Sequence, residues 1–300
     1  MTEGLSHPPL LQDARCAVRT SVGRVSAPPV TSATGTPHPS LRGVVLRYEG
    51  YEERAVGPVT FRELPCTFVP IIIDLDAGWA VTHRQHTTPL RLGSFVAGVT
   101  DGPVLVRHDG SARCLQVNLT PLGARRLVGL PMSELANQTV PIDDVLGRFG
   151  RDLVQRVGAA PDWASRFALM DKVFRARIAE SAPADPAVAW SLGQIVASGG
   201  AASIGDLAHE LGWSHRRLIA RYRDTVGLPP KLVARIVRFE RLTAHVSAEP
   251  AIDWAAAATA CGYFDQAHLA REVRELAGIT PTELRASTVN FVQDDAALLA

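Results

Sequence analysis

The last third of the chain contains an internal repeat. Residues 211–230 align with residues 261–281, and the second copy has one extra residue in its turn. Both copies carry the same boundary signals in the same order: a helix N-cap, a glycine that ends the first helix, and a second N-cap. These residues are Ser203, Gly212 and Ser214 in the first copy and Asp253, Gly262 and Asp265 in the second. Each copy is therefore predicted to form two helices joined by a tight turn, the helix-turn-helix plan.

The second helix of each copy is predicted to have two distinct faces. Its apolar face carries Leu218, Tyr222 and Val226 in the first copy and Leu269, Val273 and Ala277 in the second. Its opposite face carries Arg216, Arg217, Ala220 and Arg223 in the first copy and Ala267, His268, Arg271 and Arg274 in the second. A DNA-recognition helix needs this division, because one face anchors the helix while the other enters the major groove. The alternative is an ordinary solvated helix face, which the repetition disfavours.

Positive charge is concentrated in one short segment. The whole chain has a net charge of +1, but residues 214–241 hold eight Lys and Arg residues against two acidic ones. A local excess of this kind is the electrostatic footprint of a polyanionic partner. Within it, Pro229 and Pro230 begin a predicted helix on which Lys231, Arg235, Arg238 and Arg241 form a basic stripe. Phosphate contact is expected for Arg235 and Arg238, and simple solvation is the alternative.

The preceding region changes from strand signals to helix signals. Short apolar stretches separated by Gly, Pro and Asp predict strands, which suggests a sandwich or barrel. The predicted strands are 44–46, 68–74, 79–82, 95–99, 104–107 and 114–119, and the predicted helices are 121–128, 142–157 and 161–178. Trp79, Phe61, Phe68 and Phe95 are expected either to line a ligand pocket or to form the core.

These signals predict an α+β chain with a β-rich region followed by an all-α domain. We expect a disordered tail at 1–40, a sensing and dimerisation domain at 41–180 that is β-rich to about 120 and then helical, a linker at 181–186, a DNA-binding domain at 187–286 and a tail at 287–300. On the predicted helix 161–178, an apolar face runs from Trp163 to Ile178. This apolar face is expected to be buried against another part of the same chain or against a second subunit.

Segment 187–285 resembles the DNA-binding domain of AraC/XylS-type transcription regulators, in which a long helix joins two helix-turn-helix units. The resemblance rests on residues 204–218, on residues 262–271 and on residues 278–281 followed by Leu284 and Arg285. It implies base readout by Arg216, Arg217, Ala220, Gln266, Ala267 and Arg271. We expect phosphate contacts from Ser214, His215, Arg221, Arg223, Arg235, Arg238, His268 and Arg274. Ala220 and Ala267 depart from the long polar residues often found at these places. Residues 41–180 resemble the family's cupin-like sensing region.

Two other functions compete with DNA binding. A cupin-type metal enzyme needs clustered His and carboxylate ligands, but His83 and His86 are the only close pair and His108 lies on a separate stretch. The four cysteines (Cys16, Cys66, Cys114 and Cys261) show no CxxC spacing, so we expect no zinc site or disulfide framework. No sequence motif for a phosphate-binding loop, a dinucleotide site or a serine nucleophile is present. We therefore expect no catalysis, no metal and no cofactor. The other alternative is a protein-interaction module, which leaves the basic segment unexplained.

The resulting hypothesis is a sequence-specific regulator that binds double-stranded DNA and responds to a small-molecule effector of unknown identity. RNA polymerase is a further expected partner, and the resemblance favours a homodimer. No apolar run reaches the roughly 18 residues of a membrane span, and the first 40 residues contain no apolar stretch like that of a signal peptide. We therefore expect a cytoplasmic protein with no membrane contact.

Overall fold

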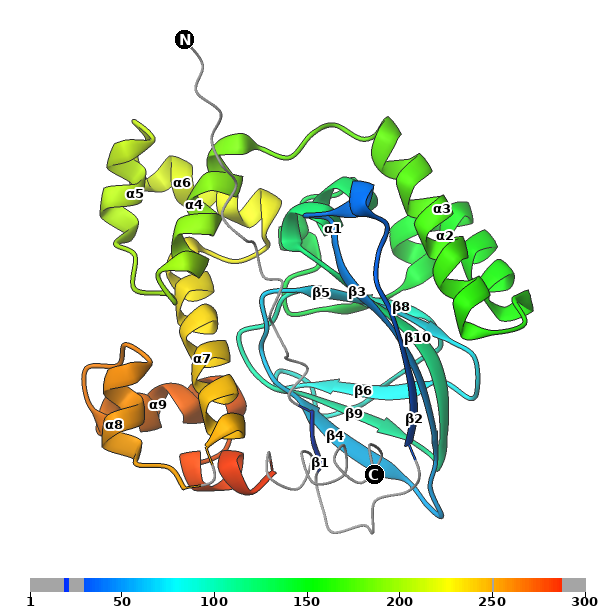
Figure 1. Cartoon of the computed structure of the whole chain (residues 1–300), viewed down its shortest axis with the longest axis horizontal. Coiled ribbons are helices and arrows are strands. Elements are labelled where there is room, and N and C mark those ends of the chain that lie inside the picture. The colour runs from blue at the N-terminus through cyan, green and yellow to red at the C-terminus, as the bar shows by residue number, and fades with distance from the viewer. Residues whose placement is uncertain (1–18, 22–29, 250, 288–300) are drawn as a thin grey trace.

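A computed structural model describes residues 19–21, 30–249 and 251–287 of the chain. Two antiparallel sheets and helices α1 to α3 (residues 121–180) form the larger part of the molecule, and the helices from α4 (residue 186) onward form a second part beside it (Figure 1). The predicted α+β class, with a β-rich region followed by an all-α region, is confirmed. Among the described residues, no helix is both long and apolar enough to cross a membrane.

The two sheets enclose an apolar core. The smaller sheet has the order β1-β4-β9-β6-β7, and the larger has the order β11-β8-β5-β10-β3-β2. Side chains from both inner faces meet in the core, among them Ile72 and Phe95 of the larger sheet and Trp79 and Val81 of the smaller one. The strands are β1 (Arg19–Ser21), β2 (Val30–Gly35), β3 (Val45–Arg54), β4 (Val59–Glu63), β5 (Val69–Asp74), β6 (Trp79–His83), β7 (Leu90–Leu92), β8 (Phe95–Ala97), β9 (Val104–His108), β10 (Ser111–Leu119) and β11 (Thr139–Pro141).

The expected tail at 1–40 is wrong over its last eleven residues. Strand β2 pairs along β3 with Thr31 opposite Glu52, and a short 3-10 helix (Pro39–Leu41) follows it. The β2 sequence is rich in Thr, Ser and Gly and lacks apolar alternation, because the strand lies at a sheet edge with much of its surface exposed. The remainder of the expected tail lies outside the described residues, apart from β1.

Three helices follow the strands: α1 (Pro121–Val128), α2 (Ile142–Ala159) and α3 (Trp163–Glu180), with a short 3-10 helix (Met132–Glu134) after α1. Two glycines allow α3 to lie directly on the larger sheet. A Cβ atom on Gly50 would lie 2.5 Å from the Trp163 ring, and one on Gly35 would lie 2.6 Å from Phe167. Phe167 also stacks on Tyr48 with a centroid separation of 5.8 Å. The apolar face of α3 is therefore covered by its own chain and leaves no need for a second subunit there.

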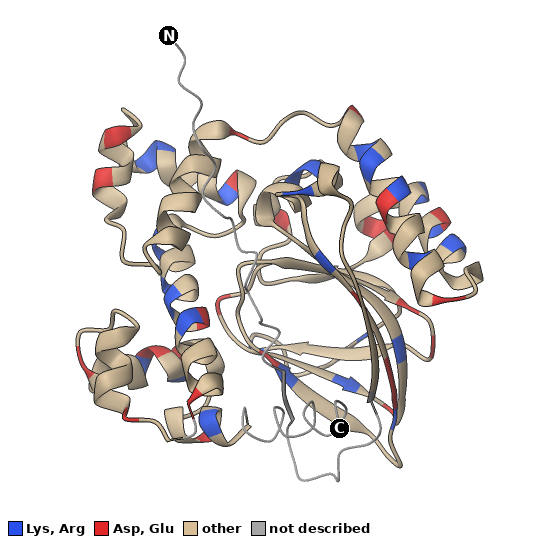
Figure 2. Ribbon diagram, viewed as in Figure 1, with Lys and Arg blue, Asp and Glu red and all other residues tan. Residues whose placement is uncertain are grey.

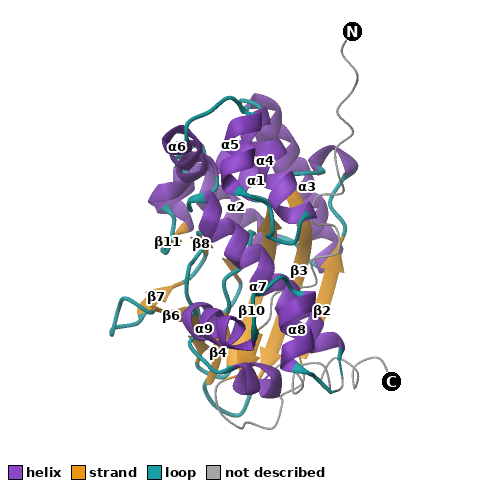
Figure 3. Cartoon of the chain, turned by 90° about the vertical axis from the view of Figure 1, so that its left-hand side faces the viewer, coloured by secondary structure: helices purple, strands orange, loops and turns teal. Residues whose placement is uncertain are grey.

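The second part contains α4 (Pro186–Ala197), α5 (Ile204–Glu210), α6 (His215–Thr225), α7 (Pro230–Ala248), α8 (Trp254–Ala260) and α9 (Gln266–Ala277). Helix α7 runs through it, with α4, α5 and α6 at one end and α8 and α9 at the other (Figures 1 and 3). The capping signals are confirmed, since Ser203, Ser214, Asp253 and Asp265 all accept backbone hydrogen bonds as N-caps. Gly212 and Gly262 adopt positive φ angles of 62° and 78°, which glycine tolerates at helix ends.

The two parts are packed against each other through one continuous apolar core. Gly227 follows α6 with a φ of 100°, and a Cβ atom there would lie 2.9 Å from the Met132 carbonyl oxygen. At the other end, the Arg84 guanidinium donates to the carbonyl oxygen of Glu275 near the end of α9, at 3.2 Å. Both helix-turn-helix units therefore contact the β-rich part.

Candidate nucleic-acid interface

Helices α6 and α9 present the two faces that the repeat predicted. The N-cap Ser214 accepts from the Arg217 N–H at 3.2 Å, and Asp265 accepts from the His268 N–H at 2.6 Å. The six residues assigned to the apolar faces are all at most 2% exposed: Leu218, Tyr222, Val226, Leu269, Val273 and Ala277. The opposite faces are thereby directed away from the domain core.

All six residues expected to read bases are exposed: Arg216, Arg217, Ala220, Gln266, Ala267 and Arg271. The Arg217 guanidinium lies 4.5 Å from the ring centroid of Trp213, which restrains it by a cation–π contact. The described structure shows no ion pair for Arg216 or Arg271, so each presents its donors to solvent in a form suited to a guanine edge.

The residues expected to contact phosphates are in two different environments. Ser214, His215, Arg223 and Arg274 are exposed on the same surface as the base-reading residues. Arg221 is also exposed, but its Nε donates to Asp185 at 2.9 Å. Asp185 is the N-cap of α4, so this pair ties the recognition helix α6 to the helix behind it.

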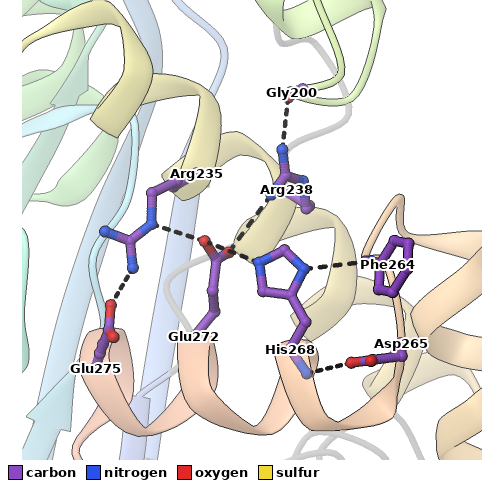
Figure 4. Close-up of polar contacts among 8 residues, drawn as sticks. All are labelled: Gly200, Arg235, Arg238, Phe264, Asp265, His268, Glu272 and Glu275. Carbon is purple, nitrogen blue, oxygen red and sulfur yellow. Dashed lines mark hydrogen bonds and ion pairs between the residues drawn. The ribbon is translucent and has the colours of Figure 1, made fainter.

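Arg235 and Arg238 are engaged in a cluster between α7 and α9 (Figure 4). Arg235 donates through Nε to Glu272 at 2.7 Å and also binds Glu275. Arg238 lies 3.7 Å from Glu272 and donates to the Gly200 carbonyl oxygen at 3.0 Å. Glu272 is only 6% exposed, so it requires these partners. This acidic centre was not predicted from the sequence, where its signal is a carboxylate one turn after His268 on α9.

The basic stripe of α7 is thus partly neutralised by acidic residues of α9. Figure 2 shows blue and red segments side by side where these helices meet. Burial alone would lower the pKa of Arg235, but hydrogen bonds and charge interactions with Glu272 and Glu275 outweigh it and raise the pKa. The cluster holds α9 against α7, which sets the position of one recognition helix relative to the other.

The histidines considered as metal ligands have other roles. His83 is buried and hydrogen-bonds to the Thr139 hydroxyl at 2.8 Å, and burial lowers its pKa. His108 lies 3.0 Å from Glu53, and its Nδ1 accepts from the Gly110 N–H at 3.3 Å. Glu53 lies on the larger sheet and His108 on the smaller, so this buried pair joins them. No group of three or more His, Cys, Asp or Glu arranged to hold a metal is found among the residues with described positions.

A cavity of about 100 Å³ lies between the two sheets. Phe68, Trp79 and Phe95 are buried in the core and also line this cavity, whereas Phe61 is buried against the His108 ring. Phe239 and Thr243 of α7 also line this cavity, and the sequence analysis missed them. They lie about one helical turn apart on α7, but only the folded structure brings that helix to the β-rich region.

The contact between α7 and the β-rich region is completed by Glu240. Its carboxylate accepts from the Thr67 N–H at 2.9 Å and from the Thr67 hydroxyl at 2.9 Å. Burial raises the pKa of Glu240 to about 7, although the hydrogen bonds from Thr67 act in the opposite direction. Thr67 lies between Cys66 and Phe68, which both line the cavity. The cavity and the Glu240–Thr67 contact are therefore adjacent.

A family model matches each of the two parts of the chain. Residues 207–287 match the family model described as Helix-turn-helix domain, which is of the AraC type, and residues 33–141 match a domain of unknown function, DUF6597. No curated protein matches the chain.

Comparison with solved structures gives matches of low sequence identity and low structural similarity. ToxT from Vibrio cholerae with a bound unsaturated fatty acid is 9% identical, with 81% of this chain and 95% of that chain covered and a TM-score of 0.47. A second ToxT structure from Vibrio cholerae is 9% identical, with 80% and 96% covered and a TM-score of 0.45. The AraC-like transcriptional activator CuxR is 13% identical, with 72% and 86% covered and a TM-score of 0.25.

The matched model covers the paired helices whose caps, turns and exposed faces are described above. The chain is therefore a DNA-binding transcription regulator whose residues 207–287 form a helix-turn-helix domain of the AraC type.

Proposed function

We propose that the chain reads a two-part site on double-stranded DNA, with α6 and α9 each in a major groove. The observation that supports this most directly is the pair of capped helices at opposite ends of α7, each with a buried apolar face and an exposed polar face. The proposed base-reading residues are Arg216, Arg217, Ala220, Gln266, Ala267 and Arg271. Ser214, His215, Arg223 and Arg274 are proposed to contact phosphates. His268 lies 3.7 Å from Glu272 and is proposed to contact phosphate only if it leaves this cluster. Arg221, Arg235 and Arg238 do so only if their ion pairs open.

In vitro selection of operators by the full chain tests this proposal. The selected sequences should contain two short blocks about one helical turn apart, and footprinting should protect two successive major-groove faces. Selection of one uninterrupted block, or of no sequence at all, would contradict the proposal.

We also propose that an effector occupies the cavity between the sheets and controls DNA binding through α7. The cavity is lined by Phe68, Trp79 and Phe95, and α7 closes it with Phe239 and Thr243. None of the cavity-lining residues that the structure describes is a lysine or arginine, and Glu63 is acidic. These surroundings favour an uncharged, apolar ligand over an anion. Engineered apolar cavities of about 150 Å³ bind benzene, so the ligand is small.

Two probes of matched size, benzyl alcohol and benzoate, separate these ligand classes. Benzyl alcohol should raise the melting temperature of the full chain and change its affinity for a selected operator. Benzoate should do neither. Ala97→Leu, which places a larger side chain into the cavity wall, should abolish the response to benzyl alcohol. Equal responses to both probes, or a response that survives in the variant, would contradict the cavity assignment.

The remaining proposals concern organisation and context. We propose a non-enzymatic, cytoplasmic regulator with a cupin-like sensing domain at 30–180, a linker at 181–186 and a DNA-binding domain at 187–286. RNA polymerase is a proposed partner. A homodimer is proposed from the family resemblance alone, because α3 is covered within the chain. Light scattering with and without operator tests the dimer, since a constant mass near 32.2 kDa would exclude it.

A further inference from the structure

Phe264 is the residue by which the second copy of the repeat exceeds the first. The Trp213 N–H donates to the Ala208 carbonyl oxygen and the Tyr263 N–H donates to that of Ala258, both at 2.8 Å. Trp213 and Tyr263 therefore occupy equivalent places after their glycines. Ser214, the N-cap of α6, follows Trp213 directly, whereas Phe264 separates Tyr263 from the N-cap Asp265.

The inserted ring does not contribute to the domain core. The Phe264 side chain is 91% exposed, whereas Tyr263 beside it is 4% exposed. Its backbone is nevertheless held in place, because the Phe264 N–H donates to His268 Nδ1 at 3.2 Å and Asp265 caps the same turn (Figure 4). The backbone thus places an exposed aromatic ring at the N-terminal end of α9, where a recognition helix meets base edges.

A second apolar side chain, Ala267, lies close by on α9. When the N-caps Ser214 and Asp265 are aligned, Arg216 of α6 corresponds to Ala267 of α9. The first unit therefore offers a guanidinium where the second offers a methyl group. Arginine pairs with guanine N7 and O6, glutamine pairs with adenine N6 and N7, and alanine or phenylalanine contacts the thymine C5-methyl group.

We propose that the two units read different bases at the N-terminal ends of their recognition helices: the first reads guanine through Arg216, and the second reads A·T pairs through contact of Phe264 and Ala267 with thymine methyl groups and of Gln266 with adenine. The guanine contact proposed for Arg271 lies one turn further along α9. This inference rests on the proposed DNA-binding function. It makes the operator chemically asymmetric, with a guanine-containing block for α6 and a thymine-containing block for α9.

Replacing single thymines by deoxyuridine in a selected operator tests the proposal, because this change removes only the C5-methyl group. In the block bound by α9, one replacement should weaken binding of the parent chain about three- to fivefold, the effect of one buried methyl group. Phe264→Ala should bind the thymine operator more weakly and lose this sensitivity at that position. Phe264→Leu should retain part of it.

Val56→Ala is the matched control, since Val56 is a fully exposed apolar residue of the β-rich region. It should leave affinity and deoxyuridine sensitivity unchanged. Uniformly weaker binding of Phe264→Ala to all sequences, with deoxyuridine sensitivity intact, would overturn the proposal and indicate a sugar–phosphate contact. Unchanged DNA binding by Phe264→Ala would overturn it in favour of a protein partner. Failure of the parent chain to select any operator would instead overturn the underlying DNA-binding function.

Discussion

The carboxylate of Glu240 on the long helix α7 accepts two hydrogen bonds from Thr67 of the β-rich region. Glu240 precedes Thr243 by less than one turn and follows Phe239, and both of these neighbours line the cavity between the sheets. Because α7 connects the two helix-turn-helix units, we expect a change at this contact to reach both recognition helices. The contact therefore joins the surroundings of the proposed effector site to the DNA-binding helices.

Glu240→Gln should make the chain less sensitive to pH. The pKa of Glu240 is raised to about 7, so between its ordinary value and pH 7 the native protein holds a proton that the unfolded chain has lost. Stability from this group is therefore greatest at low pH and falls as pH rises towards about 7. Glutamine keeps an acceptor for Thr67 without the charge, and should stabilise the chain at pH 8 by on the order of 1–2 kcal/mol.

Urea denaturation of the parent and Glu240→Gln at pH 4 and pH 8 measures this difference. The variant should exceed the parent only at pH 8. Glu249→Gln, at an exposed site just after α7, serves as the control and should change neither value. A parent that gains stability from pH 5 to pH 8 relative to Glu240→Gln would show the opposite sign and refute the assignment.

Glu272→Ala should loosen α9 from α7. Removing this buried carboxylate leaves Arg235 and Arg238 without their shared partner. The free energy of unfolding should fall by about 2–3 kcal/mol, which is less than for a fully buried ion pair because both arginines are partly exposed. Asp152→Ala breaks the exposed pair with Arg148 and should cost less than about 0.5 kcal/mol. Thermal unfolding compares the two variants. Equal stabilities for Glu272→Ala and the parent would show that the cluster does not hold the units together.

Arg216→Ala and Arg271→Ala should each relax specificity in a different block of the operator. Both side chains are exposed on recognition helices, and a bidentate arginine–guanine contact is worth about 1–3 kcal/mol of discrimination. Repeated operator selection with each variant locates the block affected. If both variants select the parent's operator with the parent's affinity, neither arginine reads a base.

DNA binding should depend steeply on salt and more on the first unit than on the second. With about 4–6 cations on phosphates, the slope of log K against log salt should be roughly −4 to −5. Arg223→Ala on α6 should reduce the slope by about 1, whereas Arg148→Ala, at an exposed site on α2, should leave it unchanged. Fluorescence anisotropy at several salt concentrations measures these slopes. A nearly flat dependence would instead favour protein contacts.

Local signals in the sequence were sufficient for the helix-turn-helix units. Caps such as Ser214 and Asp265, and the positive-φ glycines Gly212 and Gly262, act over one turn of chain, so their pattern predicts the helix ends directly. Apolar spacing likewise identified the buried faces of α6 and α9. The sequence analysis missed strand β2, because an exposed edge strand lacks the apolar alternation that such reasoning detects.

Contacts between distant residues were decided only by the tertiary structure. The basic stripe of α7 suggested phosphate contacts, yet Arg235 and Arg238 bind Glu272, 37 and 34 positions further along the chain. Glu240 accepts hydrogen bonds from Thr67, and Phe239 closes a cavity whose strand residues lie a hundred or more positions earlier. A charge or ring on a helix has the same local sequence signature whether its partner is solvent, DNA or another element. The physical reason is that its desolvation and its ion pairs depend on what packs against it, which the fold alone determines.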